Sequence, residues 1–309
     1  MFMQKKIRVL IVGFGNIAKT HAALMMRIKS FEFAGVVDAR PEAVAAAQQF
    51  RVDVPVYATL ADALAAGSFD AAILCTPHHV HYEQCTQCLS AGLHVLCEKP
   101  VCLSMEDFDR LAALSAQSNR VLVAGDMMRY WPNVVWARHQ IRSGVIGEIR
   151  HIIRDRITQQ SDAGGRAWAH NPAEAGGWLL YGTGIHEIDA LLYMTGASLV
   201  RAEAFACVNN AGWNDWDELS VCGLLSGGTV FNLNQTLNGG EFLMTTRLIG
   251  TKGVIVLQGD SIAVLNGEKL FLAQNNAFHS QLLSFARTIL QGEENRAAVT
   301  AHRHGALVQ

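Results

Sequence analysis

A glycine-rich turn between an apolar run and a helical pattern constrains the fold of this chain most. Residues 13–18 read G-F-G-N-I-A, after a β-branched apolar run at residues 7–13 and at the start of helical apolar spacing at residues 16–30. Glycine at the first and third positions and alanine at the last keep this turn free of side-chain bulk. The segment therefore predicts a strand–turn–helix unit near the N-terminus.

The alternation of strands and helices continues to about residue 125. We expect further strands at residues 33–38, 54–57, 70–75, 94–97 and 121–124, and helices at residues 41–50, 60–66, 81–91 and 105–117. Strands joined by helices through right-handed crossovers form a parallel, doubly wound sheet. The pattern predicts an α/β fold with an N-terminal Rossmann domain over residues 1–125.

The pattern changes in the second part of the chain, where strands follow one another through short turns. We expect strands at residues 149–159, 199–208, 219–225, 229–237, 244–250, 253–257 and 261–265, and helices at residues 131–143, 184–194 and 280–290. Strands in such runs pair mostly antiparallel. Residues 126–309 are therefore predicted to form a C-terminal α+β domain with a large, mostly antiparallel open sheet.

The glycine turn has the features of a dinucleotide site. Gly13 permits the tight turn, Gly15 lets a pyrophosphate approach the backbone, and the helix that follows offers free N–H groups to phosphate. Asp38 ends the second strand, where a carboxylate accepts hydrogen bonds from the ribose hydroxyls of NAD and repels the 2′-phosphate of NADP. Arg40 softens that rejection, so we expect NAD, with NADP also possible.

Other polar residues follow the later strands of the same sheet. Thr76-Pro77 and Glu98-Lys99 end two of them, and ligands of open α/β sheets bind at the carboxyl ends of strands. Lys99 can reach both the reactive ring of the cofactor and a substrate hydroxyl. The expected cofactor-binding residues are Gly13, Phe14, Gly15, Asn16, Ile17, Asp38, Arg40, Thr76, Pro77, His81, Glu98 and Lys99.

Two groups of metal-ligand residue types have plainer interpretations. The histidines at positions 78, 79 and 81 have no carboxylate pair nearby, so we read them as loop and helix-start residues. Cys85 and Cys88 form a C-x-x-C, but they lie in a predicted helix with no second C-x-x-C, which favours two packed thiols over a redox or metal site. We expect no metal.

Composition limits the partners and the compartment. The formal net charge is -2, which gives no electrostatic footprint for nucleic acid or an anionic membrane. The early apolar run is too short to span a bilayer. Seven cysteines at irregular spacing argue against a disulfide framework. We therefore expect a cytoplasmic protein that binds neither nucleic acid nor membrane.

Taken together, the motifs resemble one known family. The order G-x-G-x-x-A, Asp38, T-P-x-x-x-H at residues 76–81, A-G-x-H-V-x-C-E-K-P at residues 91–100, and G-G followed by G-x-H-x-x-D at residues 176–189 resembles the glucose–fructose oxidoreductase / inositol dehydrogenase / rhizopine-catabolism family, Gfo/Idh/MocA. The resemblance covers essentially the whole chain. It implies oxidation or reduction of a sugar, cyclitol or related diol, and a homo-dimer or tetramer formed through the C-terminal sheet.

The resemblance also implies roles for single residues. Lys99 matches the substrate-binding catalytic lysine of the family, and His186 matches the acid/base histidine of inositol dehydrogenase-like members. Many of those members carry an aspartate four residues before the histidine, where this chain has Gly182. Either His186 and Lys99 share the proton transfer, or another group takes the place of the aspartate. Asp189, one helical turn after His186, is expected to stabilise the helix.

Further expectations concern substrate contacts and the departures from the family pattern. Besides Lys99 and His186, we expect Arg129, Trp168 and His170 to bind substrate, because aromatic faces and forked donors suit a polyhydroxylated ligand; the same residues suit a core or an interface. Leu93 replaces a lysine common in relatives. The chain ends at Gln309, where relatives continue into a longer helix, so it is a short member or truncated.

Two other functions fit the same sequence. One is a dihydrodiol or cyclic-acid dehydrogenase of aromatic catabolism, because the second half is rich in tryptophan and lacks the aspartate. The other is a non-catalytic protein that senses NAD, since a fold does not fix a function. Retention of Lys99 and His186 favours an enzyme.

Overall fold

A computed structural model describes residues 6–160, 167–210, 213 and 215–298 of the chain. The chain divides into two compact units. Of the described residues, the first unit holds those up to Gly125 together with residues 278–298, and the second holds Asp126–Ala277. Among the described residues, no helix has the length and apolar character needed to cross a bilayer.

The first unit is built on a six-stranded sheet in which all strands run parallel. The strand order is β3-β2-β1-β4-β5-β6, the arrangement of a Rossmann fold. Helices cover both faces, so every residue of the central strand β4 is apolar and buried. The strands are β1 (Ile7–Val12), β2 (Phe31–Val37), β3 (Val56–Tyr57), β4 (Ala71–Leu74), β5 (His94–Cys97) and β6 (Leu122–Ala124).

The helices of this unit begin where the sequence places their caps. The side chains of Thr59 and Ser104 accept hydrogen bonds from backbone N–H groups in the first turns of α3 and α5, and Pro41 opens α2. Cys85 and Cys88 lie buried on α4, as packed thiols do. The helices are α1 (Asn16–Met25), α2 (Pro41–Phe50), α3 (Leu60–Ala66), η1 (His78–Val80), α4 (His81–Ser90) and α5 (Met105–Gln117).

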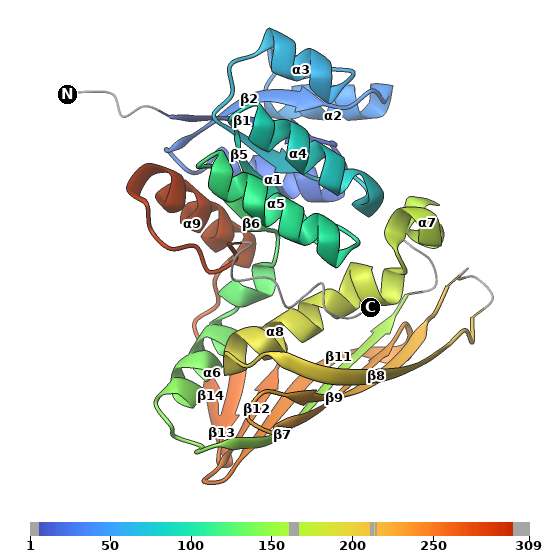
Figure 1. Cartoon of the computed structure of the whole chain (residues 1–309), viewed down its shortest axis with the longest axis vertical. Helices are drawn as coiled ribbons and strands as arrows, with labels where there is room; N and C mark the ends of the chain where they lie inside the picture. The colour runs from blue at the N-terminus through green and yellow to red at the C-terminus, as the bar shows by residue number, and fades with distance from the viewer. Residues whose placement is uncertain (1–5, 161–166, 211–212, 214, 299–309) are drawn as a thin grey trace. The chain divides into compact units, whose positions relative to one another are not determined.

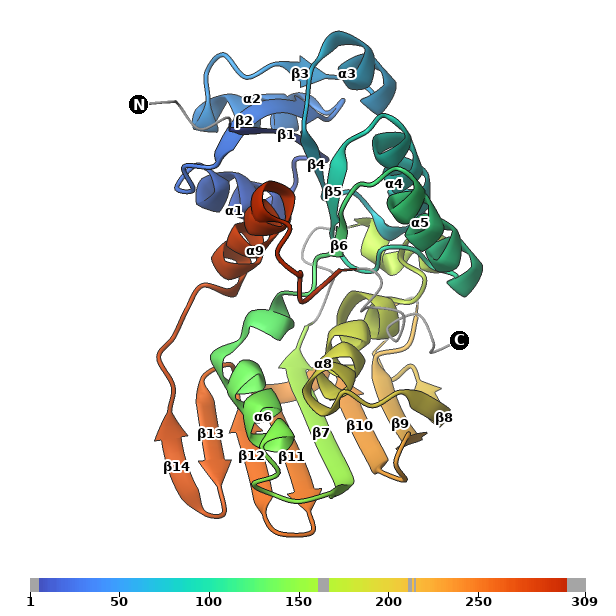
Figure 2. The same cartoon turned by 60° about the vertical axis from the view of Figure 1, so that its left-hand side comes forward.

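The last helix, α9 (Ala277–Gln291), belongs to the first unit, whereas the sequence analysis gave it to the second. Leu282 and Phe285 are fully buried in the core of the first unit, and the ring of Phe285 lies 6.5 Å from that of Phe31. Figure 2 shows α9 beside α1. An amphipathic pattern predicts that a helix buries one face, but it does not say which of two cores that face enters.

The second unit contains an eight-stranded sheet in the order β14-β13-β12-β11-β7-β10-β9-β8. Only the β7–β10 pair is parallel, so the prediction of a mostly antiparallel sheet is confirmed. The strands are β7 (Ile149–Gln159), β8 (Leu199–Cys207), β9 (Glu218–Leu225), β10 (Val230–Thr236), β11 (Asn238–Gly250), β12 (Val254–Gln258), β13 (Ile262–Leu265) and β14 (Glu268–Phe271). Strand β14 was not predicted because this edge strand is mostly exposed and lacks an apolar pattern.

Helices cover one face of this sheet and leave the other face open. On β10, Phe231 and Leu233 point into the core while Val230 and Asn234 are exposed. Figures 1 and 2 show α6 (Pro132–Arg142) and α8 (Ile185–Thr195) on the covered face. No described helix lies over the opposite face.

Short helical segments precede α8 and were not predicted. They are η2 (Met127–Tyr130), η3 (Ala167–His170), α7 (Pro172–Ala175) and η4 (Trp178–Gly184), of which η4 is a π-helix. Gly182 lies in η4, where a Cβ atom would stand 2.5 Å from the ring of Trp178. The π-helical winding leaves no room for a side chain at this position, which explains the glycine.

Candidate active site

The dinucleotide turn joins β1 to α1 in the first unit. Gly13 has φ +78°, and a Cβ there would stand 2.8 Å from the Thr76 side chain. At Gly15 a Cβ would meet nothing within 4 Å, so the backbone faces open space at the start of α1. The unsatisfied N–H groups of a helix start bind phosphate at such a place. The geometry of the turn therefore suits a pyrophosphate.

Asp38 lies beside this turn and is held by three donors. Its carboxylate accepts from the backbone N–H of Phe14 at 2.8 Å and from the backbone N–H and guanidinium of Arg40. Burial raises the pKa of Asp38, but the hydrogen bonds from Arg40 and Phe14 outweigh it and hold the pKa below its ordinary value. Asp38 is therefore an anion positioned for ribose hydroxyls, and Arg40 is tied to it.

His81 connects two loops at the carboxyl edge of the sheet. Its Nδ1 lies 2.7 Å from the carbonyl oxygen of Pro100, and its Nε2 lies 2.8 Å from that of Thr76. The ring is fully buried, and this burial lowers the pKa of His81 although both carbonyls oppose the effect. The ring thus lies between the carbonyls of both loops, and we infer that His81 holds these loops in place; its contact with the cofactor, expected from the sequence, stays a prediction.

Glu98 and Lys99 follow β5 at the same edge. Glu98 lies 2.8 Å from Nε2 of His21, a fully buried residue of α1 that sequence reasoning missed. This contact fixes the end of β5 to α1, the helix that begins at the glycine turn. Glu98 therefore helps to position Lys99, the next residue. Lys99 is half-buried and joined to Pro100 by a cis peptide bond. The structure thus gathers the glycine turn, Asp38 and Lys99 at one sheet edge.

His186 lies in the first turn of α8 in the second unit. Its Nδ1 is 2.8 Å from Oδ1 of Asp126, which is fully buried, while the His186 side chain is 12 % exposed. Asp126 was missed by sequence reasoning, although it follows β6 as closely as Lys99 follows β5. When a carboxylate accepts a hydrogen bond from the Nδ1–H of an imidazole, Nε2 carries the lone pair and can accept a proton.

Asp189, one turn further along α8, pairs with Arg129. Arg129 donates to both carboxylate oxygens, at 2.8 and 2.6 Å, and its Cζ lies 5.0 Å from the centre of the Tyr193 ring. Burial lowers the pKa of Arg129, but the negative charge of Asp189 more than compensates and raises it. Asp189 therefore stabilises the helix, as expected. Arg129 is only 2 % exposed and packs α8 in place, which argues against the substrate contact expected of it.

Glu187 anchors the first turn of α8 from its other side. It is fully buried and accepts from Arg154 and, at 3.0 Å, from Nη1 of Arg156, both on β7. A buried carboxylate requires such partners. The alternating pattern of β7 gave no sign of this ion pair, because arginine at an inward position of a strand is unusual.

The other two expected substrate contacts lie on η3. The ring of Trp168 meets that of Trp178 edge-on at 5.7 Å, and the ring of His170 lies 4.7 Å from that of Trp213. Both side chains are half-buried. They form an aromatic cluster with η4, the π-helix that ends two residues before His186.

The described residues contain no group of three or more His, Cys, Asp or Glu side chains arranged to hold a metal ion. The donor set fits an organic cofactor instead. Open space at Gly15, the start of α1 and the Asp38 carboxylate suit the pyrophosphate and ribose of a dinucleotide.

Comparison with known proteins agrees with this arrangement. Residues 7–126 match the model of an "Oxidoreductase family, NAD-binding Rossmann fold", and residues 134–256 match the "GFO/IDH/MocA C-terminal domain". D-glucoside 3-dehydrogenase of Escherichia coli (strain K12) is 29% identical over 197 residues, which cover 63% of this chain and 56% of that protein. The chain thus matches little more than half the length of this relative.

Two further similarities extend over nearly the whole chain. Rhizopine catabolism protein MocA of Rhizobium meliloti is 24% identical over 300 residues, covering 96% of this chain and 90% of that one. The structure of scyllo-inositol dehydrogenase from Lactobacillus casei, with bound NAD(H) and scyllo-inositol, superposes with a TM-score of 0.83 at 22% identity, covering 98% and 94%. The chain belongs to the Gfo/Idh/MocA oxidoreductase family and carries that family's NAD-binding Rossmann domain.

Proposed function

We propose that this protein is an NAD-dependent dehydrogenase that acts on a hydroxyl-bearing carbon of a sugar, cyclitol or related diol. The observation that carries the proposal is the position of Lys99 at the same sheet edge as the glycine turn and Asp38. A dinucleotide bound across that edge lies within the reach of residues that follow β5. Relatives named as dehydrogenases of a glucoside and of scyllo-inositol support the substrate class.

The proposed chemistry divides between the cofactor and the chain. Bound nicotinamide supplies the acceptor or donor for hydride. During oxidation, the ammonium group of Lys99 donates a hydrogen bond to the substrate oxygen and stabilises the charge that develops there. Nε2 of His186 accepts the hydroxyl proton, and in reduction it returns that proton. The hydride and the proton together account for the two hydrogens lost by the alcohol.

A substrate panel tests this proposal. The purified protein is mixed with NAD and, one at a time, with aldoses, glycosides, inositols and dihydrodiols, and NADH formation is followed by absorbance. We expect turnover with at least one sugar or cyclitol. Stoichiometric binding of NAD without turnover on any compound would contradict the proposal and favour a sensor of NAD.

The aromatic cluster favours a second candidate. The contacts of Trp168 with Trp178 and of His170 with Trp213 offer flat apolar faces in the second unit. Such faces also suit a less polar ring, as in a dihydrodiol or cyclic acid of aromatic catabolism. In the same panel, dihydrodiols oxidised with higher kcat/KM than any polyol would select this alternative.

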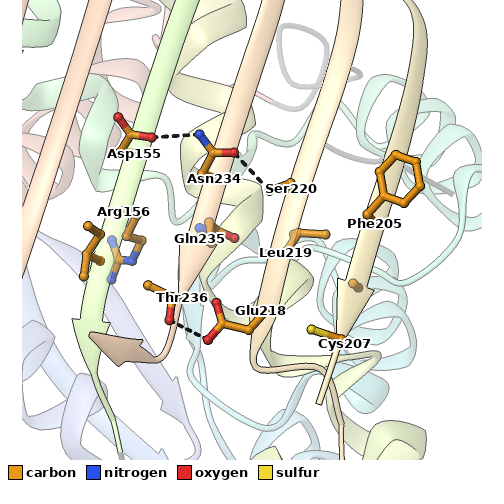
Figure 3. Close-up of a pocket in the computed structure, with 12 residues that line it drawn as sticks. Asp155, Arg156, Phe205, Cys207, Glu218, Leu219, Ser220, Asn234, Gln235 and Thr236 are labelled. Carbon is orange, nitrogen blue, oxygen red and sulfur yellow. Dashed lines mark hydrogen bonds between the residues drawn. The ribbon is translucent and has the colours of Figure 1, made fainter. Parts of the chain in front are cut away.

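We also propose that the open face of the second sheet binds a second copy of the chain. Several apolar side chains of this face are exposed, namely Phe205, Leu224, Val230, Leu243 and Phe271. A cavity of about 450 Å³ lies on this face beside Phe205. Figure 3 shows its lining residues, among which Asn234 donates a hydrogen bond to Asp155 and Ser220 donates one to Asn234. Exposed apolar side chains in such number mark an association surface.

Sedimentation velocity tests this association. The wild-type chain is expected to sediment as a dimer or tetramer. Phe205→Glu, which places a charge on the open face, should shift it toward the monomer with little change in unfolding temperature. A monomeric wild type would contradict the proposal.

We place the protein in a reducing compartment, the cytoplasm. All seven cysteines are free thiols, and five of them lie partly or fully inside the first unit. An odd number of unpaired cysteines suits a compartment in which thiols stay reduced.

A further inference from the structure

We propose that Asp126 is the positioning residue of His186. This inference rests on the proposed function, because it assigns to Asp126 the task of preparing His186 for proton transfer. Asp126 follows β6, and its Oδ1 lies 2.8 Å from Nδ1 of His186 in the first turn of α8. The two residues are 60 positions apart in sequence, so the pair exists only in the folded chain.

The hydrogen bond fixes the tautomer of the imidazole. An ionised carboxylate only accepts hydrogen bonds, so Nδ1 of His186 carries the proton and Nε2 carries the lone pair. Asp126 is fully buried, whereas the His186 side chain retains 12 % exposure. The buried carboxylate therefore orients the ring from the protein interior, and the partly exposed ring is the group that a substrate reaches.

The other acidic side chains of this region are committed elsewhere. Asp189 is held by two hydrogen bonds from Arg129, and Glu187 is held by Arg154 and Arg156. Both lie on α8 with His186, but they face other elements.

The position four residues before His186 offers no alternative carboxylate. It holds Gly182, where a Cβ would stand 2.5 Å from the ring of Trp178. Among the carboxylates in the described part of the second unit, only Asp126 is hydrogen-bonded to the ring.

The charges around the pair support an ionised Asp126. Arg129 lies in η2, the short helix that follows Asp126 directly. The negative charges of Asp189 and Asp126 both raise the pKa of Arg129. One guanidinium thus lies near two carboxylates, and it donates two hydrogen bonds to Asp189. The charge of Asp126 stabilises the imidazolium that forms when Nε2 of His186 accepts a proton.

Asp126→Asn tests the inference, because it preserves shape and removes the charge. We expect kcat to fall about 100-fold, with KM and the Kd for NADH within about twofold of wild type. Asp126→Glu, which retains the carboxylate, should recover most of the lost kcat.

Two further variants separate positioning from general damage. If Asp126 acts through His186, the double variant Asp126→Asn/His186→Gln should be no slower than His186→Gln alone. Asp189→Asn is the matched control, since it removes a carboxylate of the same helix that contacts Arg129. We expect it to lower the unfolding temperature and to leave the tautomer of the His186 ring unchanged. Additive losses in the double variant would overturn the inference.

A measurement without substrate keeps this inference separate from the proposed function. Nitrogen-15 NMR of the ring of His186, assigned with His186→Gln, reports the tautomer of the neutral ring in the whole protein. We expect a ring protonated at Nδ1 in the wild type and a larger share of the Nε2–H tautomer in Asp126→Asn. The same tautomer in both proteins would overturn the positioning role. The expected NMR difference in a protein that oxidises no compound of the panel would refute the dehydrogenase instead.

Discussion

The guanidinium of Arg40 donates two hydrogen bonds to the carboxylate of Asp38, from Nε at 3.0 Å and from Nη2 at 2.8 Å. The same carboxylate accepts from the N–H of Phe14 within the glycine turn. Asp38, the acid that favours NAD, is therefore paired with Arg40, the cation suited to the 2′-phosphate of NADP. While they are paired, Asp38 limits the binding of phosphate by Arg40, and Arg40 limits the binding of ribose hydroxyls by Asp38.

This pairing predicts how cofactor choice responds to substitution. Asp38→Ala removes the acceptor for ribose hydroxyls and releases Arg40, so kcat/KM for NAD should fall and that for NADP should rise, each by about tenfold. Arg40→Ala should reduce the use of NADP while NAD is used nearly as before. The ratio of kcat/KM for the two cofactors checks both. An unchanged ratio in Asp38→Ala would refute this role of the acid.

His81 predicts a link between pH, stability and cofactor binding. Burial lowers the pKa of His81, so the folded state binds a proton at this ring less readily than the unfolded chain does. The contribution of the ring to stability is therefore present above the ordinary pKa of about 6.5 and is lost as pH falls through the lower pKa of the folded state. In His81→Asn, stability should therefore fall less steeply as the pH is lowered. The midpoint of urea unfolding, measured as a function of pH, checks this expectation.

The same substitution should loosen the two loops that His81 joins. We expect His81→Asn to lower the free energy of unfolding by about 1–3 kcal/mol at neutral pH, because carbonyls of Thr76 and Pro100 lose a buried partner. Calorimetry should show weaker binding of NADH as well. His79→Asn, a substitution of an exposed neighbour, is the control and should change neither quantity.

Gly182 predicts that an aspartate cannot simply be returned to this position. In Gly182→Asp the new Cβ would be forced against the Trp178 ring, so we expect a loss of about 1–3 kcal/mol in the free energy of unfolding and no gain in kcat. Gly240→Ala is the control, since a Cβ there meets nothing within 4 Å. A stable Gly182→Asp variant with higher kcat would contradict the account of η4.

The sequence predicts the first unit well because its signals are local. Each signal lies within a few residues, as with the turn glycines, the cap Ser104 and the proline that opens α2. The observed bounds of α2, α3, β5 and α5 agree with the predicted ones. The location of α9 could not be read in this way, because it depends on which distant core accepts Phe285.

The candidate site was predictable only where single positions carry the chemistry. Gly13, Asp38 and Lys99 could be named from the sequence because they follow strands that end at one edge of the sheet. Three pairs of the site join residues that are 60 or more positions apart in sequence, so no local pattern predicts them. These pairs are His186–Asp126, Arg129–Asp189 and His21–Glu98. The reason for Gly182 likewise appears only in the structure, where the π-helical winding of η4 brings its backbone against the ring of Trp178.

The most direct test of the proposed dehydrogenase is the turnover of Lys99→Ala with the best substrate of the panel, measured together with its Kd for NADH. We expect kcat to fall by about 1000-fold or more while the Kd for NADH changes by less than about threefold, because Lys99 acts on the substrate oxygen at the transition state. Wild-type turnover in Lys99→Ala would contradict the account, since the residue on which the proposal depends would then be dispensable.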